Sequence, residues 1–360
     1  MSTLTGSVTL LYLFDIADEI RLDDLRKRLG APDAGRVPRL RDPAPDYVRF
    51  EKPPAVESLD PITTTSGDRM SVRLSYFEFG IACIEFELPF QTGWAELVQL
   101  SARWTGSAEL EDRATALLRA RLPGAGPALV KPYETWLKED YAIVQVNETA
   151  PPSSALSLIA SHGAHIAQIV RGESARLSAT EQADVIQARM SYYPNDLIVI
   201  GWTAAFLFDT AEGAASTIDL LRYANTQLVN FRHYDEVLTR VLAGVYDRIE
   251  TRRGLFARWR LAREAENLNR IRLDIQELTE RMDNSIKFLS DMFSARLYKL
   301  AAAKIGVPDY RLLVDEKLRT AESLYHFMVD QFNHGRAFVL ELMVVIILII
   351  DLIYLFRGKA

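Results

Sequence analysis

The sequence predicts an α+β protein with a head of mixed sheet and helices, a long antiparallel helical hairpin as a stalk, and one C-terminal transmembrane helix. Three observations carry this prediction. Strand-like and helix-like segments alternate through about residue 150, and apolar residues recur every three or four positions between about residues 255 and 300. Finally, 20 nearly all apolar residues separate Arg336 from Arg357. The predicted domains are the head (1–150), a second α+β part with helices (151–253), the stalk (254–336) and the transmembrane helix (337–356).

Composition limits the classes of function. At 360 residues the chain exceeds the length at which a single core stops growing, so we expect more than one folded unit. The formal net charge of −6 makes nucleic acid an unlikely main partner, because binding a phosphate backbone requires clustered cations. Cys83 is the only cysteine, which excludes an intrachain disulfide and a Cys-based zinc site. The first residues lack a basic targeting segment, so we expect the body to stay in the cytoplasm.

The head should contain strands and helices in alternation. Ile84, Phe86 and Leu88 alternate with Glu85 and Glu87, which is the period of a half-buried strand. The segment 31–66 is rich in Pro, Asp and Arg and is expected to be mostly loop. The expected strands are 8–14, YVRF at 47–50, a pair within 71–88, and YAIVQV at 141–146; the expected helices are 22–29, 93–103 and 109–122.

The second part begins after the turn-rich NETAPPSS. A helix of small residues is expected over 155–170, and DLIVIGWTAAFLFD predicts two short strands around Gly201. Trp202 and Tyr192 are expected to be core residues rather than a stacking platform. Every strong signal after this point is helical.

The stalk is expected to consist of two long helices. The first carries the apolar stripe over about 255–300 and ends at Gly306, and Pro308 permits the second helix to start. The second helix keeps one heptad phase that continues into the apolar tail without a Pro or a turn cluster. Its members are Val314, Leu318, Ala321, Tyr325, Met328, Phe332, Gly335, Val339, Leu342 and Ile346. Two such helices joined by a tight turn form an antiparallel hairpin.

The apolar tail is expected to be a membrane anchor. A helix of 20 residues is about 30 Å long, which matches the hydrocarbon core of a bilayer. Glu341 and Asp351 lie inside this run but away from its centre, and their separation places them about 80° apart on one broad face. Two interpretations stay open: the acids are merely tolerated, or they face other copies of the helix and help to set an oligomeric bundle. An ion or proton path is the least favoured, because a single span supplies few ligands.

A family resemblance accompanies these features. YYPNDLIVIGWTAAFLFD, YANTQLVNFRHYDEVLTRVLAGVYDRIE, LTERMDNSIKFLSDMFSARLY and the tail resemble the family named for proteins required for meiotic nuclear division, particularly its bacterial branch, over about 150–360. The resemblance implies a membrane-anchored protein that forms large assemblies, with no enzymatic activity. It also matches Glu341 and Asp351 to two recurring acids of the family tail. It places the chain at a bacterial cytoplasmic membrane, with contact to ribosomes left open.

A second resemblance concerns only the architecture. An α+β cytoplasmic domain, a helical stalk and a C-terminal membrane helix are similar to the layout of CorA-type divalent cation channels. The Gly-Met-Asn filter signature of those channels does not occur in this sequence. The comparison therefore supports a homo-oligomer more than it supports ion conduction.

The search for catalytic and ligand-binding motifs yields few candidates. No nucleotide-binding or hydrolase motif is present, and the pair His162 and His165 lacks an identifiable third metal ligand. Asn225, Arg232 and Asp235 share one helical face where a simple stripe would be apolar. They indicate either an interhelical polar network or a ligand site.

These observations lead to a non-enzymatic, tail-anchored homo-oligomeric scaffold that presents cytoplasmic heads at the inner membrane. The expected partners are membrane lipid, other copies of the chain, and an unknown protein or ribosome-associated partner. No cofactor and no metal are expected. The alternatives are a CorA-like ion channel or transport component, and a ligand-binding head regulated at the membrane.

Overall fold

The computed structural model describes residues 3–29, 48–50, 52–251, 257–284, 286–288 and 292–357. It divides into two compact units. Unit 1 comprises Met1–His233 and Arg281–Arg311, and unit 2 comprises Tyr234–Glu280 and Leu312–Ala360. The long helices α6 (Ala211–Thr251) and α9 (Val307–Arg357) each contribute residues to both units.

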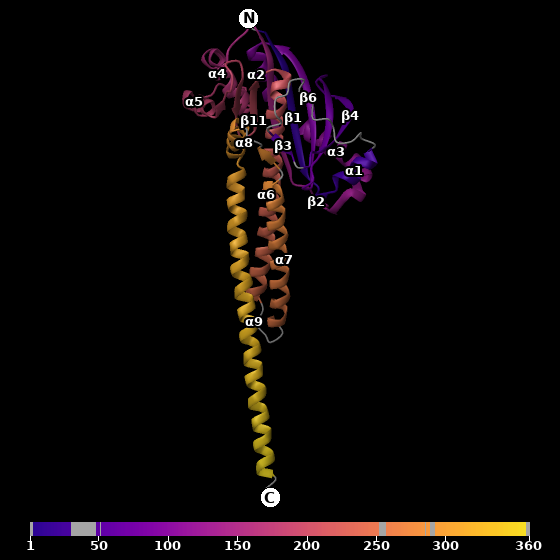
Figure 1. Ribbon diagram of the computed structural model, residues 1–360, viewed down its shortest axis with the longest axis vertical. Helices are drawn as coiled ribbons and strands as arrows, with labels where there is room; N and C mark the ends of the chain where they lie inside the picture. Colours follow the sequence, from indigo (N-terminus) through magenta and orange to yellow (C-terminus); the bar gives the residue numbers. More distant parts are fainter. Residues whose placement is uncertain are drawn as a thin grey trace. The chain divides into compact units, whose positions relative to one another are not determined.

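Unit 1 is built on an eight-stranded mixed sheet with the order β4-β5-β6-β1-β8-β11-β10-β9 (Figure 1). All neighbouring strands are antiparallel except β11 and β8, which are parallel. The strands are β1 (Thr3–Asp15), β4 (Ala55–Thr63), β5 (Arg69–Tyr76), β6 (Ile81–Thr92), β8 (Lys138–Ala150), β9 (Arg189–Met190), β10 (Leu197–Ile200) and β11 (Ala204–Phe208). Two small sheets pair β2 (Ala17–Ile20) with β7 (Leu129–Pro132), and β3 (Val48–Phe50) with β12 (Ile286–Phe288).

Helices lie on one face of this sheet over a large apolar core. Alternate residues of β1, including Val8, Leu10 and Phe14, belong to this core together with residues of the covering helices. The burial of such side chains is the main driving force for folding. The covering elements are α1 (Leu22–Leu29), α2 (Trp94–Trp104), α3 (Ala108–Ala125), the turn η1 (Gly126–Ala128), α4 (Ala155–Arg171) and α5 (Ala179–Gln187).

The opposite face of the sheet meets the first part of α6. Here β1 and β6 present buried polar side chains, among them Asp15 and Glu85, between apolar ones such as Leu11. Side chains of α6 form hydrogen bonds or ion pairs with both acids. The strand β1 is therefore buried on both faces, by the covering helices on one side and by α6 on the other. Helix α8 (Met292–Ile305) contacts β10.

Unit 2 is a three-helix bundle formed by the end of α6, α7 (Ala257–Asn284) and α9 (Figure 1). Its core brings together Leu242 and Val245 of α6, Leu268 of α7, and Ala321 and Met328 of α9. The buried α9 residues Val314, Ala321 and Met328 are seven apart, as the heptad phase predicted. Figure 1 shows α9, in yellow, continuing past the ends of α6 and α7.

The predicted α+β head is confirmed in its individual elements. The short helix over 22–29, the helices near 93–103 and 109–122, the small-residue helix over 155–170 and the two strands around Gly201 are all present. The segment expected to be mostly loop contains the nine-residue strand β4. One continuous sheet includes strands from both 1–150 and 151–253.

The stalk differs from the predicted hairpin. The first expected helix ends at Asn284, β12 follows, and α8 begins only at Met292. The apolar spacing of Ile286 suited a helix, but this residue pairs with Phe50 in a small sheet instead. Unit 2 contains three helices rather than two, because the end of α6 packs with α7 and α9.

The prediction of a transmembrane helix over 337–356 was wrong. Across the described residues, no helix combines the length and the apolar character needed to cross a membrane. The prediction of a single-pass, tail-anchored protein at the inner membrane is overturned with it.

Candidate functional site

A group of polar side chains gathers where α6 crosses the end of β1. The buried carboxylate of Asp15, only 1% exposed, has Oδ2 placed 2.7 Å from Nδ1 of His233 on α6. The ring of Tyr133 stacks on this imidazole, with the ring centroids 4.7 Å apart. The Tyr133 hydroxyl donates to Oδ1 of Asp18 at 2.5 Å, and Nζ of Lys131 lies 2.7 Å from Oδ2 of the same carboxylate.

Arg232 extends the same group along α6. Its guanidinium forms an ion pair with Glu139 at the start of β8, and it lies over the ring of Tyr310 with 5.8 Å to the centroid. A cation over an aromatic face gains electrostatic attraction from the ring. The charged groups thus balance one another through contacts between α6, the sheet and the start of α9 within unit 1.

A second buried charge group lies two to three turns earlier on α6. Arg222 donates through Nη2 to Oε2 of Glu85 at 2.9 Å, and its Nη1 pairs with Asp219. Glu85 has a side chain that is 3% exposed, and it also accepts a hydrogen bond from the Ser75 hydroxyl. Burial lowers the pKa of the Arg222 guanidinium, but the two carboxylates outweigh burial and raise that pKa above its usual value. Both charges are therefore compensated inside the protein.

The structure gives Asn225, Arg232 and Asp235 three different partners. Asn225 is buried, and its Nδ2 donates to the carbonyl of Leu221 in the same helix at 2.8 Å. Asp235 accepts from Nζ of Lys317 on α9 at 2.5 Å, in unit 2, whereas Arg232 pairs with the sheet in unit 1. These three side chains do not converge on one point.

The histidine pair lies on α4 against α2. His162 stacks on Trp94 with 4.4 Å between ring centroids, and His165 is 5.7 Å from His162 by the same measure. Burial, followed by the neighbouring His165, lowers the pKa of His162. Among the described residues, no group of three or more His, Cys, Asp or Glu side chains could hold a metal ion. The pair is a packing contact between two helices.

The acids of the tail, Glu341 and Asp351, are both exposed on α9. Glu341 precedes, and Asp351 interrupts, a segment that we call the distal segment, residues 342–355, in which 13 large apolar side chains are exposed. The exposed fractions run from 47% at Ile346 to 76% at Tyr354. No described residue covers any side of this segment.

Sequence reasoning missed the pairing of Asp15 with His233. The available signal was an acid that ends a strand with apolar residues on both faces, since a carboxylate there needs a partner when it is buried. The expectation that Trp202 and Tyr192 are core residues was wrong: they are 48% and 62% exposed.

The fold and these contacts define an α+β protein in which a mixed eight-stranded sheet is held by charged contacts to a long helix that continues into a three-helix bundle. The chain belongs to the family described as "Uncharacterized protein MJ0711, N-terminal domain", whose model matches residues 5–215. Uncharacterized protein MJ0711 from Methanocaldococcus jannaschii is similar to this chain, with 18% identity over 216 residues. The match covers 60% of this chain and 65% of that relative, so the chain spans slightly less than two thirds of the relative's length. No solved structure matches the chain.

This match corrects the family resemblance. The resemblance to the meiotic nuclear division family, over about 150–360, was wrong, because the matching family model lies at 5–215 and carries a different description. The assignment to the bacterial branch of that family was wrong as well, since the similar protein comes from an archaeon. Most of the matched range lies before residue 150, where the resemblance did not extend.

Proposed function

We propose that this chain is a non-enzymatic assembly protein whose copies associate through the distal segment of α9. The observation that carries the proposal is the exposure of 13 large apolar side chains along one uninterrupted helix. Soluble monomers rarely expose a contiguous apolar patch of more than a few hundred Å². A helix that is apolar on every side belongs inside a larger packed structure.

The heptad phase of α9 favours a second copy of the chain as the occupant. Val314, Ala321 and Met328 are buried in the core of unit 2, and Leu342 and Ile349 continue the same seven-residue spacing with about half of their surface exposed. The geometry that packs α9 against two helices in unit 2 therefore extends into the distal segment. Because its other faces are apolar as well, a bundle of more than two helices fits better than a two-stranded coil.

The magnitude of burial is sufficient for association. Full burial of one such side chain is worth about 1.5–3 kcal/mol, so covering the exposed half of 13 side chains is worth roughly 10–20 kcal/mol per copy. The loss of translational and rotational freedom costs about 4–15 kcal/mol. The net free energy of association, burial minus this cost, is therefore favourable over most of these ranges.

Glu341 and Asp351 are interface residues in this proposal. A carboxylate that enters a bundle loses hydration, and this loss limits how tightly the helices pack unless a cation lies opposite. We expect Asp351→Leu to strengthen association for this reason. The acids would then set register and subunit number at some cost in affinity.

The non-enzymatic part of the proposal is supported by the charged groups of unit 1. Arg222, Arg232 and His233 each face a carboxylate from the sheet. Such compensated groups hold a long helix in register on a sheet. Assembly would multiply the number of sheets presented to a partner and raise avidity without any new contact.

Sedimentation equilibrium of the full chain tests the proposal. The full chain should form a defined oligomer, and Ile349→Glu should shift it to monomer. Phe327→Glu is the matched control, because Phe327 lies on the same helix with 48% exposure, close to the 51% of Ile349, but outside the distal segment. The control should keep the oligomer.

Two results would overturn the proposal. One is a full chain that stays monomeric at high concentration. The other is an Ile349→Glu variant with the same mass as the control. Binding of the monomer to lipid vesicles through this segment, without self-association, would also count against assembly through copies of the chain.

A further inference from the structure

Helix α8 in unit 1 carries a strongly basic surface that is separate from the charged groups of α6. Its sequence, MFSARLYKLAAAKI, contains three cations and no acid. Arg296, Lys299 and Lys304 are all exposed, and none of them forms an ion pair or hydrogen bond with another residue that the structure describes. The opposite side of the helix is held by buried residues such as Leu297 and Ala301. The cations are therefore available to an external anion.

Exposed aromatic rings lie next to both ends of this helix. Near the start, the ring of Tyr192 contacts Phe293 of α8, with 5.1 Å between centroids, and also contacts Tyr193 at 4.7 Å. Near the end, the indole of Trp202 lies against Gly306, where an added Cβ would come within 2.8 Å of the ring. The two tyrosines are each 62% exposed.

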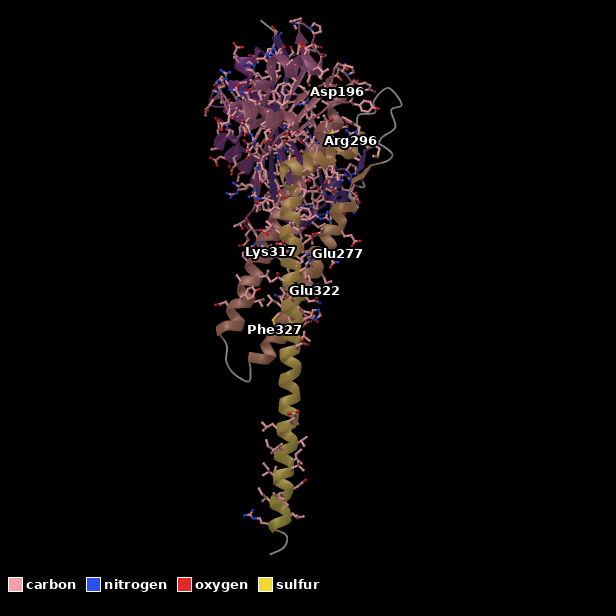
Figure 2. All side chains as sticks on the ribbon, turned by 90° about the vertical axis from the view of Figure 1, so that its left-hand side faces the viewer. Asp196, Glu277, Arg296, Lys317, Glu322 and Phe327 are labelled. Carbon is pink, nitrogen blue, oxygen red and sulfur yellow. The ribbon has the colours of Figure 1, made fainter. Side chains whose placement is uncertain are left out.

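The fold fixes this arrangement through the short strand β10. The two tyrosines precede β10 and Trp202 follows it, in the turn before β11, while α8 packs on the same strand. The carboxylate of Asp196 accepts hydrogen bonds from the backbone N–H groups of Tyr192 and Tyr193 at 2.7 and 2.8 Å. Asp196 and Arg296 are labelled in Figure 2 and lie near each other in that view. Rings and cations thus share one surface about 20 Å long, the length of a 14-residue helix.

We propose that the surface formed by Arg296, Lys299, Lys304, Tyr192, Tyr193 and Trp202 binds single-stranded nucleic acid. Such ligands are held by cations that follow the phosphates and by aromatic side chains on which bases stack. The surface supplies both groups, with the cations on α8 and the rings next to its two ends. An acidic peptide would use the cations alone and would leave the exposed rings without a role.

The net charge of the chain does not contradict this proposal. The value of −6 belongs to the whole sequence, whereas α8 alone carries +3. Among the described residues, the elements next to α8 carry Asp196, which is engaged by two backbone N–H groups, and Asp309 in the first turn of α9. The proposal is independent of assembly through the distal segment.

Fluorescence anisotropy with labelled rU10 and dT10 on the full chain tests the cationic part. Three neutralised phosphates predict a slope of about −2 for the logarithm of the association constant against the logarithm of the salt concentration. Lys304→Ala should make this slope less steep by about 0.7. Lys27→Ala, an exposed cation on α1, is the matched control and should leave the slope unchanged.

Removal of the rings tests the stacking part. Trp202→Ala should weaken binding about 5- to 150-fold and keep the salt slope, because a stacked base is worth about 1–3 kcal/mol. Tyr246→Ala removes a half-exposed tyrosine from unit 2 and should have no effect. If Trp202→Ala does not fold, Tyr193→Ala provides the same comparison at a more exposed position.

The proposal fails if the full chain does not bind either oligonucleotide at low salt. It also fails if polyglutamate binds as tightly as rU10 and the ring variants bind like the parent, because the surface would then recognise anionic peptides by charge alone. An unchanged salt slope in Lys304→Ala would remove α8 from the binding surface.

Discussion

Replacing Arg222 with methionine should cause a large loss of stability. The guanidinium lies 2.9 Å from Glu85, whose side chain is 3% exposed. Among the described residues, the Ser75 hydroxyl also donates a hydrogen bond to that carboxylate, at 3.3 Å. Removal of one member of a buried ion pair leaves an uncompensated charge and costs about 3–5 kcal/mol. For a domain of this size, that free energy corresponds to a decrease in Tm of roughly 6–20 °C.

Calorimetry or urea denaturation of the full chain measures this loss. Arg171→Met is the matched control, since the Arg171–Glu181 pair has both side chains more than a third exposed and should be worth about 1 kcal/mol or less. A second variant combines Arg222→Met with Glu85→Gln, which removes both charges and keeps an acceptor for Ser75. This double variant should recover most of the stability.

Two outcomes would refute the reasoning about Arg222. If Arg222→Met costs no more than Arg171→Met, the pair is solvated rather than buried. If the double variant is as unstable as the sum of its single changes, the guanidinium contributes through packing and not through compensation of the Glu85 charge.

Three further predictions concern other positions of unit 1. Gly80→Ala should destabilise the protein by well over the roughly 1–2 kcal/mol that a left-handed residue costs, because φ is +86° and a Cβ would lie 1.8 Å from the Ala17 carbonyl oxygen. Gly67→Ala is the control, since Gly67 has φ +88° but open space around it, and in urea titrations it should show the conformational cost alone. Cys83 is buried, and burial raises the pKa of its thiol, so alkylation should follow global unfolding; rapid labelling of the native protein would contradict the burial. Burial and then the Glu111 charge raise the pKa of Asp140, with a backbone hydrogen bond acting in the opposite direction. A raised folded-state pKa means that stability falls as pH rises through the interval above the usual carboxyl value, so Asp140→Asn should be stabilising at pH 7 and neutral below pH about 3.9, and an equal effect at both pH values would disprove this origin.

Local patterns predicted the elements whose residues repeat a clear period. The alternation around Ile84 and the helix over 22–29 are examples, since each segment satisfies its own periodicity without help from distant residues. Strand β4 escaped prediction because it is an edge strand with an irregular register between Leu59 and Ile62, which breaks the alternation. The segment near Ile286 failed for the opposite reason, since tertiary pairing with β3 overrides a helical spacing.

The candidate polar groups could be predicted only in part. The spacing of Asn225, Arg232 and Asp235 places them on one side of α6, but this helix passes from a sheet to a helical bundle over its 41 residues, so the environment of that side changes along the helix. The partner of His233 is Asp15, which lies 218 residues earlier in the chain. A single sequence contains no periodic signal for such a pairing.

The position of β1 in the sheet affects how the chain can fold while it is being synthesised. One edge of β1 pairs with β6, but the other edge pairs with β8, and the nearest paired residues, Phe14 and Lys138, are 124 residues apart. At a translation rate of about 5–20 residues per second, β8 leaves the ribosome roughly 6–25 s after β1. During that interval the hydrogen-bonding groups and apolar side chains along one edge of β1 are open to other nascent chains. Fragments that end before Lys138 should therefore aggregate, whereas those that extend through Ala150 can complete the pairing of this strand.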